Sequence, residues 1–262
     1  ADAVGHYADQ TRATAADLTI WPEGATPGYL QDEPAARTRV GAAARASGWL
    51  LIGARRYEGR GTDRRYFNAA ALVNPQGELA TMRDKRHLVP FVERGVLGMQ
   101  PMPRPFTAAS GVAEPVLAGA LRVGPLVCWD ALFPDVAREL VGHGADLLAN
   151  LSSDVDLDRA VPQMIAFSRF RAVETRRWMM RASGVGRSVV IDPLGRIIDA
   201  DELALPLSVS PPTTFYVRHG ETVPWIAALL LVLLWRRRDR EPAGASHPEP
   251  QDGDVPRPAH AP

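Results

Sequence analysis

One cysteine and one lysine occur in the 262-residue chain, and both lie in segments that could support catalysis. Cys128 closes an apolar run that begins at Val123, and Lys85 begins a segment that reads Lys-Arg-His-Leu-Val-Pro-Phe-Val-Glu and ends at Glu93. A cysteine at the end of a strand is positioned for nucleophilic attack if a neighbouring group turns it into a thiolate. An ammonium nearby would lower the thiol pKa, so these residue types predict nucleophilic catalysis.

A third candidate is Glu23, which follows Trp21 and Pro22 and could accept the thiol proton. Taken singly, each residue has a simpler interpretation: a small buried hydrophobic cysteine, a surface lysine and a solvated loop glutamate. The occurrence of all three residues in one chain favours nucleophilic catalysis over these simpler interpretations. Lys85 is the single lysine of the chain, and every other residue with a permanently charged basic side chain is arginine. Lys85 is therefore a candidate for a role that a guanidinium cannot fill, such as a compact point charge on a flexible stem.

The composition excludes several other classes of protein. Apolar residues make up 46% and charged residues 23% of the chain, which is typical of a globular domain with a real core. The formal net charge is zero, so nothing indicates a nucleic-acid partner. A single cysteine excludes an internal disulfide and a multi-cysteine metal site. We expect neither a metal nor a cofactor.

Apolar runs and turn signals alternate along most of the chain. We expect strands at residues 18–20, 49–54, 67–73, 79–82, 123–128, 146–151 and 188–191, and helices at 34–47, 133–143 and 163–181. Strands that alternate with helices predict a layered α/β domain, which we place at residues 1–222.

The C-terminal part has a different character. Residues 223–235 are almost wholly apolar, and three arginines follow at once. The run spans about 20 Å as a helix against about 30 Å of bilayer hydrocarbon, so a buried or interfacial helix is the alternative to a membrane span. We expect a transmembrane helix, with the arginines in the cytoplasm and the domain outside. Residues 236–262 are expected to be a disordered tail.

Taken in order, the motifs at Glu23, Lys85 and Cys128 resemble the Glu-Lys-Cys triad of the nitrilase superfamily. Their residue patterns are similar to those of the branch called apolipoprotein N-acyltransferase. That branch has Trp-Pro-Glu at the first motif and a Lys-x-His-Leu-Val-Pro-Phe-x-Glu run at the second. Further segments that resemble this branch are residues 150–154, 171–177, 184–188 and 215–221. The resemblance covers nearly all of residues 18–235.

This resemblance implies an α-β-β-α sandwich and a two-step acyl transfer at the cell inner membrane, with the catalytic domain on the periplasmic side. Glu23 would be the base, Cys128 the nucleophile and Lys85 the group that stabilises the oxyanion. A phospholipid would donate the acyl chain, and the amine of a diacylglyceryl-cysteine apolipoprotein would accept it. The supporting residues implied are Glu93, which resembles a second family carboxylate, and Trp129 and Asp130, which stand where the family commonly has Tyr and Glu.

Two departures keep other interpretations open. The family's loop after the third motif is replaced by residues 152–157, and the family's membrane helices ahead of the catalytic domain are not seen before Leu18. We expect either a truncated chain or a divergent form. The alternatives are a soluble amidase or nitrilase-type hydrolase with the same triad, and a degenerate paralogue that acts as a binding module.

Overall fold

The computed structural model describes residues 2–13, 16–95, 104–155, 159–198 and 212–238. Contacts divide the chain into two units, Ala1–Gly220 and Glu221–Pro262, and each is described by itself below. The domain limits expected at residues 222 and 235 stay predictions. Most of the expected tail, from residue 239 onward, lies outside the described residues.

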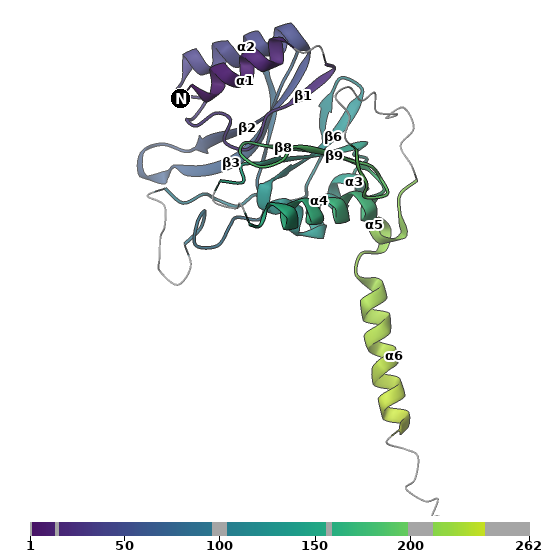
Figure 1. Cartoon of the computed structure of the whole chain (residues 1–262). Coiled ribbons are helices and arrows are strands. Elements are labelled where there is room, and N and C mark those ends of the chain that lie inside the picture. The colour runs from purple at the N-terminus through teal and green to yellow at the C-terminus, as the bar shows by residue number, and fades with distance from the viewer. Residues whose placement is uncertain (1, 14–15, 96–103, 156–158, 199–211, 239–262) are drawn as a thin grey trace, which may run out of the picture. The chain divides into compact units, whose positions relative to one another are not determined.

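The first sheet lies beneath two helices (Figure 1). Its strand order is β1-β2-β3-β4, with β1 parallel to β2 and the other pairs antiparallel. The elements are α1 (Ala3–Arg12), β1 (Leu18–Ile20), α2 (Pro34–Ser47), β2 (Trp49–Glu58), the short 3-10 helix η1 (Gly61–Asp63), β3 (Arg65–Val73) and β4 (Leu79–Asp84). Proline at the start of α2 suits a first helical turn, where its missing N–H has no partner to lose.

The second sheet has the order β10-β9-β8-β7-β6-β5, with a parallel centre of β6, β7 and β8. Helices α3 and α4 cover the face of this sheet that points away from the first (Figure 1). The elements are β5 (Val116–Ala118), β6 (Leu121–Val127), η2 (Cys128–Leu132), α3 (Pro134–Gly142), β7 (Leu147–Ser152), α4 (Val161–Thr175), β8 (Trp178–Ser183), β9 (Val189–Ile191), β10 (Ile197–Ile198) and α5 (Phe215–His219).

Three hydrophobic clusters hold these layers together. One lies between α1, α2 and the first sheet, and another between the second sheet and its helices. The third lies between the two sheets, where Leu51 and Leu72 meet Val123, Val127 and Leu151, all essentially buried. The expected α-β-β-α arrangement is therefore confirmed for the first unit.

Two expected elements were wrong at their ends. The helix expected at 163–181 stops at Thr175, because Arg176 adopts a left-handed conformation with φ 54°. The chain then forms β8, which pairs in parallel with β7. The strand expected at 123–128 ends at Val127, and Cys128 begins η2. Helix α1 and strands β5 and β10 were not predicted.

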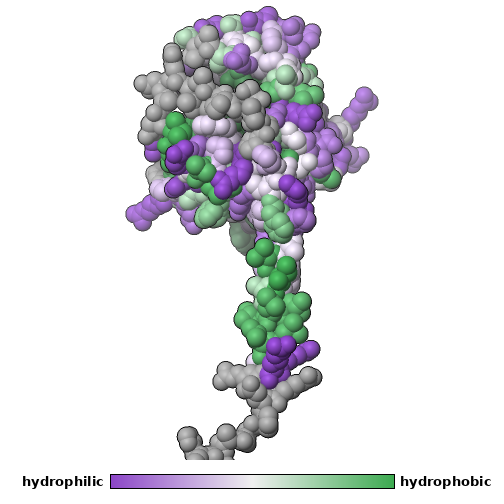
Figure 2. All heavy atoms as spheres, turned by 90° about the vertical axis from the view of Figure 1, so that its right-hand side faces the viewer, coloured by the Kyte–Doolittle hydropathy of each residue, from purple (hydrophilic) through white to green (hydrophobic). Residues whose placement is uncertain are grey.

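Helix α6 (Thr222–Arg238) makes up the described part of the second unit. In the described part of the chain, no helix combines the length and the apolar character needed to cross a membrane, so the span expected at 223–235 is not confirmed. The large apolar side chains of α6 are all at least 45% exposed, and Figure 2 shows them on its surface.

Candidate active site

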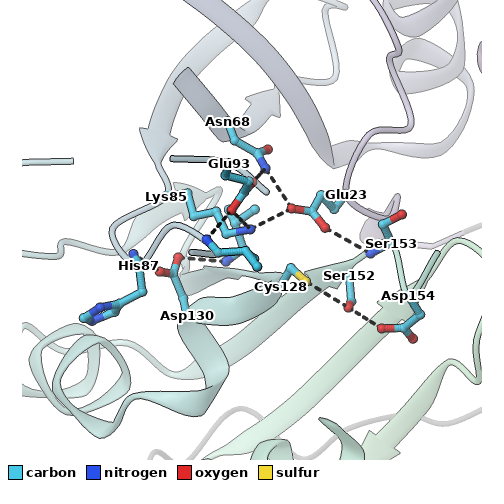
Figure 3. A network of polar contacts seen from close by, with 12 residues as sticks. Glu23, Asn68, Lys85, His87, Glu93, Cys128, Asp130, Ser152, Ser153 and Asp154 are labelled. Carbon is cyan, nitrogen blue, oxygen red and sulfur yellow. Dashed lines mark hydrogen bonds and ion pairs between the residues drawn. The ribbon is translucent and has the colours of Figure 1, made fainter. Parts of the chain in front are cut away.

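Three predicted residues come together between the two sheets (Figure 3). Glu23 lies in the loop after β1, Lys85 directly follows β4, and Cys128 directly follows β6. Lys85 is fixed on the first sheet because its backbone N–H donates to the Asn68 carbonyl on β3, at 2.8 Å. Residues far apart in sequence are thus placed at neighbouring strand ends, as the motif order predicted.

Lys85 is almost completely buried between two carboxylates. Its Nζ atom lies 3.0 Å from Glu23 Oε1 and 2.9 Å from Glu93 Oε2, and 1% of its side chain is exposed. Burial by itself lowers the pKa of the ammonium, but the negative charges of Glu23 and Glu93 outweigh it and hold that pKa above its ordinary value. Lys85 is therefore a permanent cation beside the nucleophile.

Asn68, a buried residue of β3, joins the two carboxylates. Its side-chain Nδ2 donates to Glu23 Oε1 at 2.7 Å and to Glu93 Oε1 at 2.8 Å. The second oxygen of Glu23 accepts from the Ser153 backbone N–H at 3.2 Å, and that of Glu93 from the Val89 N–H at 2.8 Å. Both carboxylates are therefore held in fixed orientations.

Cys128 sits at a sharp turn with a positive φ of 47°, an uncommon conformation for a residue that carries a side chain. Burial, with the nearby negative charge of Glu23, raises the pKa of its thiol to about 12. One ammonium and two carboxylates surround it, so a thiolate would add a second net negative charge. Cys128 is therefore a neutral thiol at rest, and a reaction in which its sulfur attacks would require a base to take the proton.

A second buried cluster lies on the other side of the sulfur. Ser152 Oγ is 3.6 Å from Cys128 Sγ and donates to Asp154 Oδ1 at 2.7 Å. Asp154 accepts hydrogen bonds from Arg181 at 2.6 and 2.7 Å and from the Ser183 hydroxyl at 2.6 Å. Burial would raise the pKa of Asp154, but these hydrogen bonds hold it below its usual range. The cluster fixes the Ser152 hydroxyl beside the sulfur.

The three predicted supporting residues have different positions. Glu93 directly contacts Lys85, and Trp129 follows the nucleophile in η2, half-buried. Asp130 is buried and accepts backbone N–H groups from Arg86, at 3.2 Å, and from His87, at 2.8 Å. It also accepts from Val127 N–H at 3.1 Å, and burial raises its pKa to about 6. Asp130 thus ties the Cys128 turn to the Lys85 loop.

Sequence reasoning missed Asn68 and Arg181. A single polar residue inside the apolar strand 67–73 was the available signal for Asn68. The position of Arg181 at the site could not be predicted, because the sequence assigned this residue to the end of the helix expected at 163–181. Among the described residues, no group of three or more His, Cys, Asp or Glu side chains could hold a metal ion.

A family model for carbon-nitrogen hydrolases matches residues 2–208, which is most of the chain. The chain belongs to the carbon-nitrogen hydrolase family. As a carbon-nitrogen hydrolase, it has the buried cysteine, lysine and glutamates described above in one cluster between the two sheets.

Curated relatives of this carbon-nitrogen hydrolase are named apolipoprotein N-acyltransferase. The protein from Geobacter metallireducens is 33% identical over 85% of this chain and 46% of its own length. The protein from Allorhizobium ampelinum is 31% identical over 88% of this chain and 47% of its own length. The chain spans about half the length of these relatives.

Solved structures confirm the fold of this carbon-nitrogen hydrolase. A carbon-nitrogen hydrolase from Helicobacter pylori G27 has a TM-score of 0.57 at 18% identity, over 74% of this chain and 77% of the other. A cysteine-to-alanine mutant of the amidase from Nesterenkonia sp. AN1 has a TM-score of 0.58 at 22% identity, over 76% of each chain. At these identities the likeness concerns the fold alone.

Proposed function

We propose that this chain transfers an acyl group from a phospholipid to the N-terminal amine of a diacylglyceryl-cysteine apolipoprotein, through a thioester on Cys128. The observation that carries the proposal is the placement of a neutral thiol beside an oriented carboxylate and a permanent ammonium. Relatives at 31–33% identity are named apolipoprotein N-acyltransferase, which supports acyl transfer over hydrolysis as the reaction of these residues.

In the first step, Glu23 takes the proton of the Cys128 thiol as the sulfur attacks the ester carbonyl of the phospholipid. The carbonyl oxygen becomes an oxyanion, and the Lys85 ammonium stabilises it. The carbon–oxygen bond then breaks, and the proton held by Glu23 passes to the leaving alkoxide of the lysophospholipid. Charge is conserved across this step because the thiol enters neutral and the thioester is neutral.

In the second step, the amine of the acceptor attacks the thioester while Glu23 accepts an amine proton. The tetrahedral oxyanion again faces Lys85, the carbon–sulfur bond breaks, and the proton returns to Cys128. An amide is more stable than a thioester, so the transfer is downhill without a nucleotide. Asn68 and Ser153 keep Glu23 in the same orientation for both steps.

Helix α6 supports action at a membrane. It is apolar on all sides, and a helix of this kind is typically buried in a protein or in lipid. We propose that α6 anchors the chain in the cell inner membrane, with its C-terminal arginines at the cytoplasmic side and the catalytic unit at the periplasmic side. Flotation with liposomes tests the anchor: the intact chain floats, and exchange of Leu229, Leu231 and Leu233 for Gln abolishes flotation.

The decisive experiment uses the fact that the chain has a single thiol. The protein is incubated with a phospholipid carrying a labelled acyl chain, and the adduct on Cys128 is measured by mass spectrometry. A diacylglyceryl-cysteine peptide is then added, and the label should move to its amine. Reaction with small amides but not with phospholipid would refute the proposal and favour the hydrolase alternative, in which water accepts the acyl group.

A further inference from the structure

Three tyrosines gather on the face of the first sheet that points toward the second. Their ring centroids are 5.4 Å apart for Tyr29 and Tyr57, 5.5 Å for Tyr29 and Tyr66, and 6.2 Å for Tyr57 and Tyr66. Tyr57 and Tyr66 are cross-strand partners on β2 and β3, so their side chains lie on one face. We call these three residues the tyrosine cluster.

Three arginines surround the tyrosine cluster. Arg64 lies over the ring of Tyr57 at 4.4 Å, and Arg104 over the ring of Tyr66 at 5.5 Å. Arg55 lies 5.9 Å from the ring of Phe106, and a bridge joins its backbone to Tyr29. Aromatic faces orient a guanidinium without neutralising its charge, so these arginines are held in place as cations.

Among the described residues, no carboxylate forms an ion pair with Arg55, Arg64 or Arg104. A cavity of about 270 Å³ elsewhere in the first unit shows the opposite pattern, since its four arginines are all paired. These pairs are Arg56 with Asp84 and Glu58, Arg65 with Glu58, Arg83 with Glu114, and Arg86 with Glu139 and Asp135. The cluster's own acidic contact is Asp32, which accepts from the Tyr57 hydroxyl. A local excess of positive charge therefore remains.

This positive surface adjoins the active site. Arg55 is the cross-strand partner of Asn68, and such partners have Cβ atoms about 4.5–5.5 Å apart. Tyr66 precedes Asn68 by two positions on β3 and so shares its face. The segment of Arg104 is also tied to the site, because Phe106 N–H donates to the Glu93 carbonyl at 3.0 Å.

The chemistry of this surface suits a phosphate. Guanidinium groups donate paired hydrogen bonds that match phosphate oxygens, and the hydroxyls of Tyr29 and Tyr66 add further donors. Burial raises the pKa of Tyr29 above its ordinary value, against the opposing effect of Arg55, so its hydroxyl keeps its proton and can donate. A group of donors with an excess of positive charge, next to Asn68 of the active site, fits an anionic group on the substrate.

We propose that Arg55, Arg64 and Arg104, with the tyrosine cluster, bind the phosphate of the glycerophospholipid whose acyl chain is transferred to Cys128. In such a lipid the phosphate and the reactive ester are carried on one glycerol unit. A phosphate held beside Asn68 therefore leaves the ester within reach of the sulfur. The inference rests on the proposed function, and it identifies the phosphate as the feature of the acyl donor that the site recognises.

Two measurements test this phosphate site separately from acyl transfer. The first titrates soluble dihexanoyl phosphatidic acid into the full chain carrying Cys128→Ala, which binds without reacting, and repeats the titration with inorganic phosphate as competitor. The second compares acylation of Cys128 by dihexanoyl phosphatidic acid and by p-nitrophenyl hexanoate, an ester without phosphate. Arg64→Gln is the test variant and Arg65→Gln its matched control, because Arg65 is the adjacent guanidinium and is paired with Glu58.

We expect Arg64→Gln, and likewise Arg55→Gln, to weaken phosphatidic acid binding about ten-fold, the effect of losing one charged hydrogen bond. The ratio of the two acylation rates should fall by a similar factor, and Arg65→Gln should keep both values. Equal losses in Arg64→Gln and Arg65→Gln would overturn the phosphate site. Displacement by inorganic phosphate at the same concentration would show a site for free phosphate and overturn its assignment to the lipid. Binding that depends on Arg64 without any acylation would keep the site and refute the acyl transfer.

Discussion

Two groups of charged side chains flank Cys128, and they differ in their net charge. On one side Lys85 is shared between Glu23 and Glu93, which gives the group a net negative charge. On the other side Asp154 is bonded twice by Arg181, and the pair is neutral. Removing one partner of a buried neutral pair leaves a buried charge and destabilises the fold, whereas the extra carboxylate beside Lys85 is available to accept a proton. We therefore expect changes on the first side to affect rate and changes on the second to affect stability.

The largest expected effect comes from Glu23→Gln, which keeps the shape of the side chain and removes the base. Acylation of Cys128 should fall by about 10²–10⁴-fold, the usual contribution of a general base. The measurement is the second-order rate of adduct formation by mass spectrometry. Glu139→Gln, which changes a glutamate paired with Arg86 outside the cluster, is the control. A loss below ten-fold would contradict the assigned role.

Lys85→Arg tests whether a compact ammonium is needed. A planar guanidinium in this nearly closed space cannot contact Glu23, Glu93 and an oxyanion at the same distances, so the rate should fall by about 10²–10³-fold. Thermal unfolding should be followed in parallel, to separate lost chemistry from lost folding. Activity close to that of the unaltered chain would show that charge alone suffices.

Asp154→Asn tests the second pair and should act on stability. Asparagine tolerates the φ of 59° at this position, but it leaves the buried Arg181 without an anion. The free energy of unfolding should drop by about 3–5 kcal/mol. Urea titration measures this, and the acylation rate of the remaining folded protein should change far less than in Glu23→Gln. An unchanged free energy of unfolding would show that the pair is not structural.

Asp154→Asn should also change how the free energy of unfolding depends on pH. Asp154 has a pKa below its usual range in the folded chain, so its contribution to stability is complete above about pH 4, the unfolded pKa. That contribution is lost as the pH falls through the lower folded pKa. Asp154→Asn should therefore have a flatter stability curve than the unaltered chain below pH 4, measured by urea titration at several pH values.

The smallest expected effect is that of Ser152→Ala. The Ser152 hydroxyl can exchange its hydrogen bond to Asp154 for one to the Cys128 thiolate, so its loss should raise the already high pKa of Cys128 and slow alkylation by iodoacetamide roughly three- to ten-fold at a fixed pH. In the unaltered chain the alkylation rate should keep rising toward pH 12. A plateau near pH 9 would show an ordinary thiol and contradict the assigned burial effect.

The two groups of charged residues beside Cys128 also differ in how well they could be predicted from the sequence. Glu23, Lys85 and Cys128 stand in motifs with distinctive neighbours, so their order was sufficient to group them. Arg181 stands in a long stretch without Gly or Pro that looks like one helix. The break at Arg176 is a backbone conformation that arginine rarely adopts, and it depends on the pairing of β8 with β7. Tertiary contacts, rather than local propensity, place Arg181 beside Asp154.

The position of Asn68 has a mechanical consequence. Its side-chain amide donates to Glu23 and Glu93, and its backbone carbonyl accepts from the Lys85 backbone N–H, so both carboxylates and the backbone of Lys85 are tied to one strand of the first sheet. Cys128 directly follows β6 of the second sheet. A change in the spacing of the sheets would shift the sulfur relative to Lys85 and Glu93, whereas Glu23, which also accepts from the Ser153 N–H directly after β7, is held from both sheets. The apolar residues packed between the sheets therefore set the separation between Cys128 and the charged groups that the first sheet holds.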